Sequence, residues 1–190
     1  MQKLKEAILE RGRAINSDVL LVDAFVNHQI DVALMRDVGE AFAAHFRGRK
    51  FDRVVTIESS GIAPAAFTAL AMDLPLVVLK KQTSRIMTGE LLQTTVRSFT
   101  KGTEYELTVK RDFLRAGENV LLIDDFLASG EAALGVIRLA EQAGATVAGV
   151  GIVIEKAFQS GHDRLAELGL DVLSLARISA MSENGIEFVD

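Results

Sequence analysis

From residue 53 onward the sequence alternates short apolar runs with amphipathic helical segments, and this rhythm limits the possible folds more than any other feature. The runs are rich in Val, Ile and Leu and occupy residues 53–57, 75–79, 119–123 and 146–154. Such runs are typical of strands that are buried on both faces. Between them we predict one helix from about Pro64 to Met72 and another that ends at Gly144. Strands that alternate with helices predict an α/β fold with a mostly parallel, twisted sheet flanked by helices.

Three segments lie outside that rhythm. Before residue 50 we predict two amphipathic helices, one over 2–11 and one that begins at an N-cap, Asp31. The apolar stretch between them, 16–29, is compatible with a strand or with an extended loop. Residues 80–118 form a long excursion in which 104–109 indicates a hairpin, and excursions of this length are usually functional. Because the sequence shows no repeat and no linker, we expect one domain over residues 1–190.

Composition excludes several classes of protein. The chain carries 21 basic and 26 acidic residues, a formal charge of −5, which argues against a nucleic-acid binder with a broad basic surface. The absence of cysteine excludes disulfides, thiolate metal sites and thiol catalysis, and is typical of a cytoplasmic protein. The charged N-terminus resembles neither a signal peptide nor a membrane span, so we expect no membrane partner. The histidines lack metal-ligand spacing, so we expect no metal site built from protein ligands; they are His28, His45 and His162.

The clearest chemical signal is the run VLLIDDFLASGEAA at 120–133. Asp124 and Asp125 follow four apolar residues, and Ser129 and Gly130 precede a predicted helix. Ligands of open α/β sheets bind at the carboxyl ends of strands, and the free N–H groups of a helix start favour a phosphate. The loop is therefore predicted to hold a phosphate. The alternative is a plain turn in which Ser129 caps the helix.

This combination resembles the signature of the type I phosphoribosyltransferases, which use 5-phosphoribosyl 1-diphosphate (PRPP). Three further segments are similar to the xanthine-specific bacterial branch of the purine enzymes: VDAFVNHQID at 22–31, ESSGIAPA at 58–65 and GIVIEKAFQ at 151–159. Ala132 stands where a second hydroxyl residue is common in the wider superfamily, and that branch is similar in having alanine there. The resemblance implies the type I fold, with a small purine-binding hood from about 1–50 and 155–190 and a flexible-loop excursion at about 80–118.

The resemblance also implies roles for the run at 120–133. The PRPP phosphate would bind the loop that follows the paired acids, which consists of Ala128, Ser129, Gly130, Glu131 and Ala132. Asp124 and Asp125 would be the catalytic carboxylates, accepting hydrogen bonds from the ribose hydroxyls or from metal-bound water. Adjacent strand residues face opposite sides, so we expect the two acids to differ in role unless the chain has already turned. The Glu131 side chain is expected to point away from the phosphate.

A second loop, implied by the resemblance to bind the diphosphate, consists of Glu58, Ser59, Ser60 and Gly61. Taken alone, this segment could equally be a capped turn before a helix. Lys80, Lys81 and Arg85 could neutralise the diphosphate, across a subunit interface as in related enzymes, or they could be a solvated run of charges. The segment 97–100, RSFT, resembles the flexible loop that closes over PRPP.

For the base, the resemblance implies contacts with Leu20, Asn27 and Lys156. A lysine ammonium satisfies the carbonyl of a 6-oxopurine, whereas the 6-amino group of adenine would face it with a donor. The Asn27 amide could serve the second carbonyl of xanthine. Without the resemblance, Lys156 could be a solvated surface charge and Asn27 a turn cap.

The implied reaction converts xanthine and PRPP to xanthosine 5′-monophosphate and diphosphate, a step of purine salvage. The resemblance also implies Mg²⁺, bound mainly through PRPP, and a homodimer. Two alternatives remain: another 6-oxopurine phosphoribosyltransferase, and a PRPP-binding regulatory protein of the same fold that lacks catalysis. Lys156 argues against an adenine-type enzyme.

Overall fold

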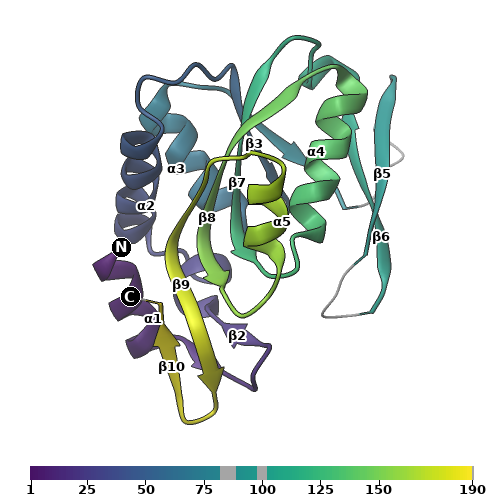
Figure 1. Cartoon of the computed structure of the whole chain (residues 1–190). Helices are drawn as coiled ribbons and strands as arrows, with labels where there is room; N and C mark the ends of the chain where they lie inside the picture. Colours follow the sequence, from purple (N-terminus) through teal and green to yellow (C-terminus); the bar gives the residue numbers. More distant parts are fainter. Residues whose placement is uncertain (82–88, 98–101, 190) are drawn as a thin grey trace.

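The centre of the molecule is a six-stranded sheet with the strand order β10-β9-β8-β7-β3-β4 (Figure 1). The computed structural model describes residues 1–81, 89–97 and 102–189. Its parallel strands are β3 (Arg53–Ile57), β4 (Leu76–Leu79), β7 (Asn119–Leu127), β8 (Thr146–Lys156) and β9 (Val172–Ser182). At one edge β10 (Gly185–Phe188) pairs antiparallel with β9. The predicted α/β fold with a mostly parallel sheet is therefore confirmed, and β9 and β10 are strands that the apolar pattern did not reveal.

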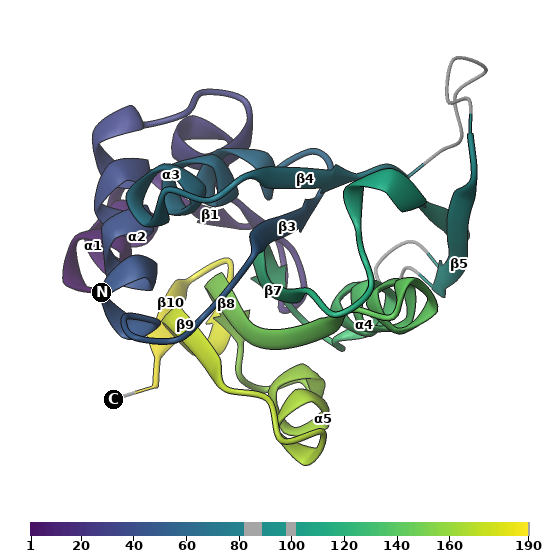
Figure 2. The same cartoon turned by 90° about the horizontal axis from the view of Figure 1, so that it is seen from above.

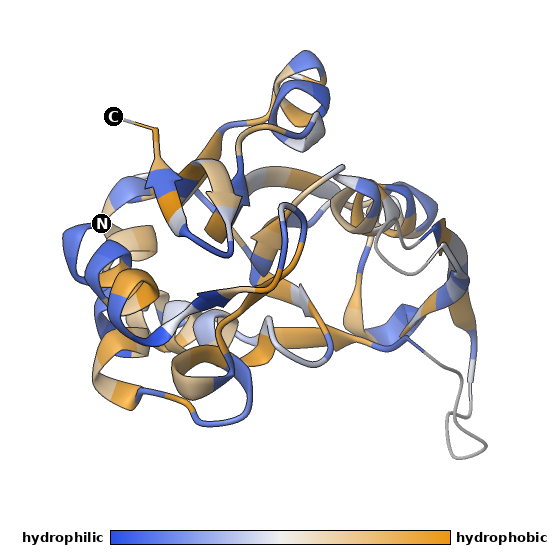
Figure 3. Ribbon diagram, turned by 90° about the horizontal axis from the view of Figure 1, so that it is seen from below, coloured by the Kyte–Doolittle hydropathy of each residue, from blue (hydrophilic) through white to orange (hydrophobic). Residues whose placement is uncertain are grey.

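Helices cover both faces of the sheet (Figure 2). Side chains of a strand alternate between its faces. Val54 and Leu121 therefore pack with one set of helices, α1 (Gln2–Arg11), α2 (Val32–His45) and α3 (Ile62–Met72). Val55 and Leu122 pack with the other, α4 (Glu131–Ala143) and α5 (Gly161–Glu167). Apolar residues dominate the central strands in Figure 3, as expected for strands buried on both sides.

The excursion between β4 and β7 contains the predicted hairpin, made by β5 (Leu91–Arg97) and β6 (Glu104–Lys110) and followed by a 3₁₀ turn, η2 (Arg111–Phe113). The hairpin lies against α4, where Arg138 donates hydrogen bonds to Thr94 Oγ1 (3.0 Å) and to the Thr95 carbonyl (2.9 Å). A Cβ on Gly135 of α4 would lie 2.5 Å from Val96 Cγ2, so a glycine is what allows this close approach. Arg85 and residues 98–100, which belong to the predicted excursion, lie outside the described residues.

The stretch 16–29 is neither a single strand nor an extended loop. β1 (Arg13–Ala14) and β2 (Leu20–Leu21) form a two-stranded antiparallel pair, and η1 (Asp23–Asn27) is a π-helical turn. Asp31 then caps α2 as predicted, with its Oδ1 accepting a hydrogen bond from the Leu34 N–H at 3.0 Å.

The two ends of the chain pack together beside this region (Figure 1). The Met1 ammonium donates to the Leu175 carbonyl, and Lys5 Nζ donates to the Val189 carbonyl at 3.3 Å. Lys5 Nζ also lies 5.1 Å from the centre of the Phe188 ring. None of the helices in the described parts of the chain is both long and apolar enough to span a membrane.

The strand order changes direction between β3 and β7. The chain adds β4 on one side of β3 and then crosses to place β7 on the other side, with β8 and β9 beyond it. In open α/β sheets, the crevice at the carboxyl ends of the two strands at such a reversal is the usual ligand site. Here that crevice lies between the loop after β3 and the loop after β7.

Candidate active site

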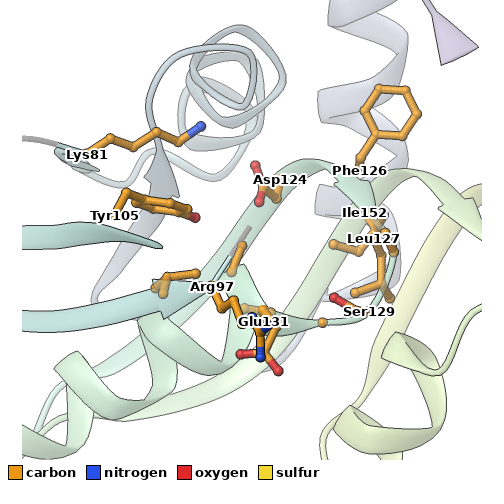
Figure 4. A pocket seen from close by; sticks show the side chains of 14 residues that line it. Lys81, Arg97, Tyr105, Asp124, Phe126, Leu127, Ser129, Glu131 and Ile152 are labelled. Carbon is orange, nitrogen blue, oxygen red and sulfur yellow. The ribbon is translucent and has the colours of Figure 1, made fainter. Parts of the chain in front are cut away.

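A pocket of about 170 Å³ opens at the carboxyl end of β7. Figure 4 shows Lys81 and Tyr105 on one side of it, Ser129 on the other and Asp124 between them. All five residues of the predicted phosphate loop, 128–132, line this pocket. The structure therefore brings together the loop after β7, one acid of the pair and two side chains from the excursion.

The loop conformation leaves backbone donors free at the start of α4. Gly130 is the N-cap residue and has a left-handed conformation (φ 84°), which glycine adopts without steric cost. No side chain caps the helix, so Ser129 does not play the capping role that was the alternative. The first intrahelical hydrogen bond runs from the Leu134 N–H to the Gly130 carbonyl at 2.9 Å. The N–H groups before it are those that a helix start offers to an anion.

The paired acids lie within strand β7, which continues to Leu127 and does not end before Asp124 as the apolar run indicated. The chain has therefore not turned, and the two side chains face different surroundings. Asp124 lines the pocket and is only 8 % exposed. Asp125 is partly exposed and does not line the pocket, although its negative charge acts on both Asp124 and Lys156.

Burial raises the pKa of Asp124 well above its ordinary value, and the neighbouring charge of Asp125 raises it further. The Asp125 N–H, which donates to Asp124 Oδ1 at 3.0 Å, and the positive charge of Lys81 act in the opposite direction. A carboxyl group with a raised pKa at a pocket wall can exchange a proton or a hydrogen bond with a ligand.

The predicted diphosphate loop adjoins Asp124 through Gly61. A Cβ on Gly61 would lie 2.6 Å from Asp124 Oδ1 and 2.3 Å from Thr56 Oγ1, so the loop can pack here only without a side chain. Ser59 is exposed, Ser60 is partly buried, and neither lines the pocket.

Glu58 of that loop contacts the segment that follows β4. Its Oε1 accepts a hydrogen bond from the Lys81 N–H at 2.7 Å, and its Oε2 pairs with Lys80 Nζ at 3.1 Å. Burial raises the pKa of Glu58, but the bonds to Lys81 and Lys80 outweigh that effect and lower it. The carboxylate therefore fixes the segment after β4 to the loop after β3, and it directs Lys81 toward the pocket.

Tyr105 and Arg97 bring the hairpin into the same pocket. Lys81 Nζ lies 5.6 Å from the centre of the Tyr105 ring, a cation–π distance. Tyr105 was not singled out from the sequence, although it is the single tyrosine of the chain. Arg97 and Lys81 add positive charge to the lining of the pocket; Lys81 lies beside Tyr105, and Arg97 lies near Glu131 (Figure 4).

Lys156 lies at the end of β8, away from that pocket, and is 8 % exposed. Its Nζ donates a hydrogen bond to the Asp18 carbonyl and lies 5.6 Å from the centre of the Phe126 ring. Burial lowers the pKa of Lys156, while the charges of Asp18 and Asp125 oppose the shift. The alternative of a freely solvated lysine is therefore wrong.

The other two residues implied for the base site, Leu20 and Asn27, are not among the residues that contact Lys156 Nζ. Leu20 is 7 % exposed and belongs to the apolar core on the side of α1 and α2. Asn27 is exposed at the last residue of the π-helical turn, and among the described residues its side chain takes part in no hydrogen bond. Asp18 and Phe126, which do contact Lys156, were not identified from the sequence because one acts through its carbonyl and the other reads as strand core.

The described residues include no group of three or more His, Asp or Glu side chains that could hold a metal ion. Asp124 lines the pocket together with Glu131, which is paired with Arg164, and Asp125 follows Asp124 in β7 without lining the pocket. Asp124 and Asp125 fit an ion such as Mg²⁺ that keeps several waters and is bound largely by substrate oxygens.

Comparisons with known proteins agree with this geometry. The family model described as "Phosphoribosyl transferase domain" matches residues 27–171. The chain is 54% identical to xanthine phosphoribosyltransferase 1 of Clostridium botulinum strain Hall, over 100% of both chains. It is 52% identical to xanthine phosphoribosyltransferase of Clostridium acetobutylicum, again over 100% of both. The crystal structure of adenine phosphoribosyltransferase from Rhodothermus marinus shares the fold, with a TM-score of 0.76, 24% identity and coverage of 93% of this chain and 97% of the other. The chain belongs to the phosphoribosyltransferase family.

Proposed function

We propose that this enzyme transfers the phosphoribosyl group of PRPP to xanthine, giving xanthosine 5′-monophosphate and diphosphate. The observation that carries the proposal is the placement of a phosphate-type loop and a buried lysine at the ends of two adjacent strands. β7 leads into the loop, β8 ends at Lys156, and the two strands pair up to Leu127 and Glu155. A ligand with a phosphate at one end and an oxo-substituted base at the other fits that arrangement. The relatives at about half identity bear the matching name.

In this proposal the phosphate of PRPP binds the N–H groups of residues 128–132. A ring nitrogen of the purine attacks the anomeric carbon, and the bond from that carbon to the diphosphate oxygen breaks. Diphosphate leaves with the bonding electrons, and the N–H proton of the purine imidazole ring passes to solvent water. Glycosyl transfers of this kind pass through an oxocarbenium-like state. Asp124, at the pocket wall, accepts hydrogen bonds from the ribose or from metal-bound water. Lys81 and Arg97 stabilise the charge of the leaving diphosphate.

Lys156 selects the base. Its ammonium has three donors, of which one serves the Asp18 carbonyl, so others are available for the 6-carbonyl of xanthine. An adenine amino group would present a donor to the same cation and would leave it unpaired, which is costly in a buried site. Asn27 serves the second carbonyl and Leu20 supports the apolar wall. The segments 1–50 and 155–190 together form the hood over the purine.

Mg²⁺ belongs to the proposal as a cofactor that is bound mainly through the diphosphate of PRPP. When bound, it neutralises part of the charge on the leaving group. Asp124 and Asp125 are the residues that would hold its waters. Activity is expected to disappear when excess EDTA is added to the assay and to return when Mg²⁺ is restored in excess.

The test of the proposed function is a diphosphate-release assay with one purine at a time. We expect release with PRPP and xanthine to exceed that with hypoxanthine, guanine or adenine. Preference for another 6-oxopurine would overturn the assignment of xanthine but keep the enzyme class. No release with any purine, despite PRPP binding in a calorimeter, would favour the regulatory alternative. Preference for adenine would remove Lys156 from base selection.

A homodimer in the cytoplasm completes the proposal. Leu70 is 76% exposed and Phe113 is 53% exposed, and an apolar groove of about 320 Å³ runs along the edge strand β4 beside Phe113. Exposed apolar surface of this kind is typical of an interface. We expect sedimentation analysis to give twice the mass of the chain and Phe113→Ser to shift it toward the monomer. A monomer at every concentration tested would contradict the dimer.

A further inference from the structure

Helix α5 lies directly beside the proposed phosphate loop, although it contributes nothing to the pocket lining. The Gly161 N–H donates to the Ala128 carbonyl at 2.9 Å. Arg164 Nη1 donates to the Ser129 carbonyl at 2.5 Å. Arg164 Nη2 also pairs with Glu131 Oε1 at 2.8 Å. One short helix thus contacts three of the five loop residues from outside the pocket.

The contact depends on the absence of a side chain at residue 161. A Cβ on Gly161 would lie 2.3 Å from the Ala128 carbonyl oxygen and 2.9 Å from the Gly130 nitrogen. From the other side, a Cβ on Gly130 would lie 3.1 Å from Gly161 Cα. Two backbones therefore touch here with glycine on both sides.

This packing decides which backbone groups of the loop face the ligand. The carbonyls of Ala128 and Ser129 accept hydrogen bonds from α5, and the carbonyl of Gly130 accepts one from Leu134 at 2.9 Å. All three oxygens are thereby engaged by partners other than a ligand. An anion site made of backbone N–H groups needs this arrangement, because a carbonyl oxygen that turned inward would repel the anion.

Arg164 also neutralises a negative charge next to the proposed phosphate site, that of Glu131. Glu131 is the first residue of α4 and belongs to the loop, so its carboxylate would repel a phosphate bound there. The ion pair with Arg164 neutralises that carboxylate and holds it on the α5 side. This ion pair gives a physical reason to expect that the Glu131 side chain points away from a bound phosphate.

α5 can act in this way because it is itself fixed to the sheet. Glu155 of β8 is 1% exposed and accepts hydrogen bonds from His162 Nδ1 at 3.0 Å and from Arg177 Nε at 2.8 Å. Leu165 is fully buried against the α4 side of the core. The helix that carries Arg164 is therefore attached by a buried carboxylate and by an apolar side chain.

We propose that Arg164 is a positioning residue for PRPP, which acts by holding the carbonyl of Ser129 and the carboxylate of Glu131 away from the phosphate. The proposal rests on the proposed function, because it takes residues 128–132 as the phosphate-binding loop. It adds a residue that does not touch the substrate and lies in a helix outside the pocket.

The test is steady-state kinetics of Arg164→Gln, with Arg36→Gln as the matched control because Arg36 is exposed on α2. We expect the KM for PRPP to rise about tenfold, the lower end of what loss of a charged hydrogen bond costs. The KM for xanthine, measured at saturating PRPP, should stay within about twofold, because Arg164 does not reach the base site. Arg164→Lys, which keeps the charge but not the fork, should lie between the wild type and Arg164→Gln.

A second variant separates positioning from general support of the fold. In the Arg164→Gln background, Glu131→Gln removes the carboxylate that has lost its partner, so the KM for PRPP should recover by about threefold. A change in melting temperature alone, with both KM values unaltered, would overturn the proposal. So would an equal rise of both KM values, or a double variant no better than Arg164→Gln.

Gly130→Ala, measured in parallel, shows which assignment has failed. Its left-handed φ and its contact with Gly161 mean that the added methyl group must disturb the loop. If Gly130→Ala raises the KM for PRPP and Arg164→Gln does not, the role of Arg164 is wrong and the loop assignment stands. If neither variant changes it, the loop assignment is wrong as well.

Discussion

The two ends of the proposed substrate site are built in different ways. At the phosphate end, residues 128–132 come from one continuous stretch, and the groups that face the ligand belong to the backbone. At the base end, Lys156 of β8 meets Asp18 of the N-terminal segment, which is 138 residues away in sequence, and Phe126 of β7. One end depends on local conformation, and the other depends on how distant segments pack.

This difference predicts how each end responds to mutation. Backbone donors survive most side-chain changes but fail when the conformation or the spacing changes, as at a glycine. Side-chain donors fail when that one side chain is removed, while the rest of the site stays in place. Glycine variants should therefore damage the use of PRPP, and side-chain variants at the base end should damage the use of xanthine alone.

The largest effect is expected for Gly61→Val, which tests the spacing between the loop after β3 and Asp124. Its Cβ would lie 2.3 Å from Thr56 Oγ1 and 2.6 Å from Asp124 Oδ1, so one of these groups must move. A misplacement of about 1 Å in a catalytic site costs on the order of 100-fold, and we expect that loss in kcat/KM for PRPP. Gly185→Val is the matched control, because no atom lies within 4 Å of its added Cβ. A loss below about threefold at Gly61 would remove this spacing from the mechanism.

Lys156→Met should give the next largest effect and separates the two ends. Methionine keeps most of the side-chain volume and removes the ammonium. Loss of a charged hydrogen bond costs roughly 1.5–3 kcal/mol, so kcat/KM for xanthine should fall about 10- to 100-fold. The Kd for PRPP, measured by calorimetry without a base, should not change. Lys50→Met at an exposed site is the control. A loss of PRPP affinity as large as the loss of xanthine turnover would show that the two ends are not independent.

The phosphate end could be predicted from the sequence because its residues are neighbours along the chain. Asp124, Ser129 and Gly130 follow a strand that the apolar run at 119–123 already reveals. The sequence pattern placed the end of that strand too early, because Asp124 and Asp125 are polar and follow the apolar run. In the structure, β7 stays paired with β8 as far as Leu127. Tertiary pairing extended the strand beyond its local pattern.

The base end could not be derived in the same way. Lys156, the hydrogen-bond donor of the base end, follows an apolar run in the sequence. Its partner is the main-chain carbonyl of Asp18, and the side-chain type at a position does not predict a contact made by its carbonyl. The π-helical turn at 23–27 has no sequence signature comparable to the cap at Asp31. Arg164 was not identified from the sequence for a related reason, because its two partners belong to a loop 33 to 35 residues earlier in the chain.

The melting temperature of Asp124→Asn tests whether the Asp124 carboxylate at the phosphate end is buried at a cost to stability. Because the pKa of Asp124 is raised in the folded state, folding favours its protonated form. Stability from this group is full below its ordinary pKa of 3.8 and is lost as the pH rises through the raised value. Asparagine has no charge to bury, so the variant should melt higher than the wild type near neutral pH. We expect roughly 2–4 °C, which corresponds to about 1 kcal/mol in a chain of this size.

The same comparison at low pH serves as the control for Asp124. The difference in melting temperature should shrink as the pH falls through the raised pKa of Asp124 toward 3.8, because the carboxyl group of the folded wild type becomes protonated over that range. A difference that stays constant with pH would mean that packing, and not the charge, separates the two proteins. Activity of the variant should fall in the same samples, so that stability and function change in opposite directions.

Asn27→Ala should give the smallest effect, and it examines how far the base end extends into the N-terminal segment. Asn27 is exposed on η1, so the unfolding free energy should change by less than about 0.5 kcal/mol. If its amide serves the second carbonyl of xanthine, the lost hydrogen bond is worth about 0.5–1 kcal/mol, and the KM for xanthine should rise about two- to fivefold. Hypoxanthine, which lacks that carbonyl, should be used equally well by both proteins. Gln29→Ala, at an exposed position just beyond the same turn, should affect neither base. An equal loss with xanthine and hypoxanthine would mean that η1 shapes the pocket and that the Asn27 amide makes no bond to the base.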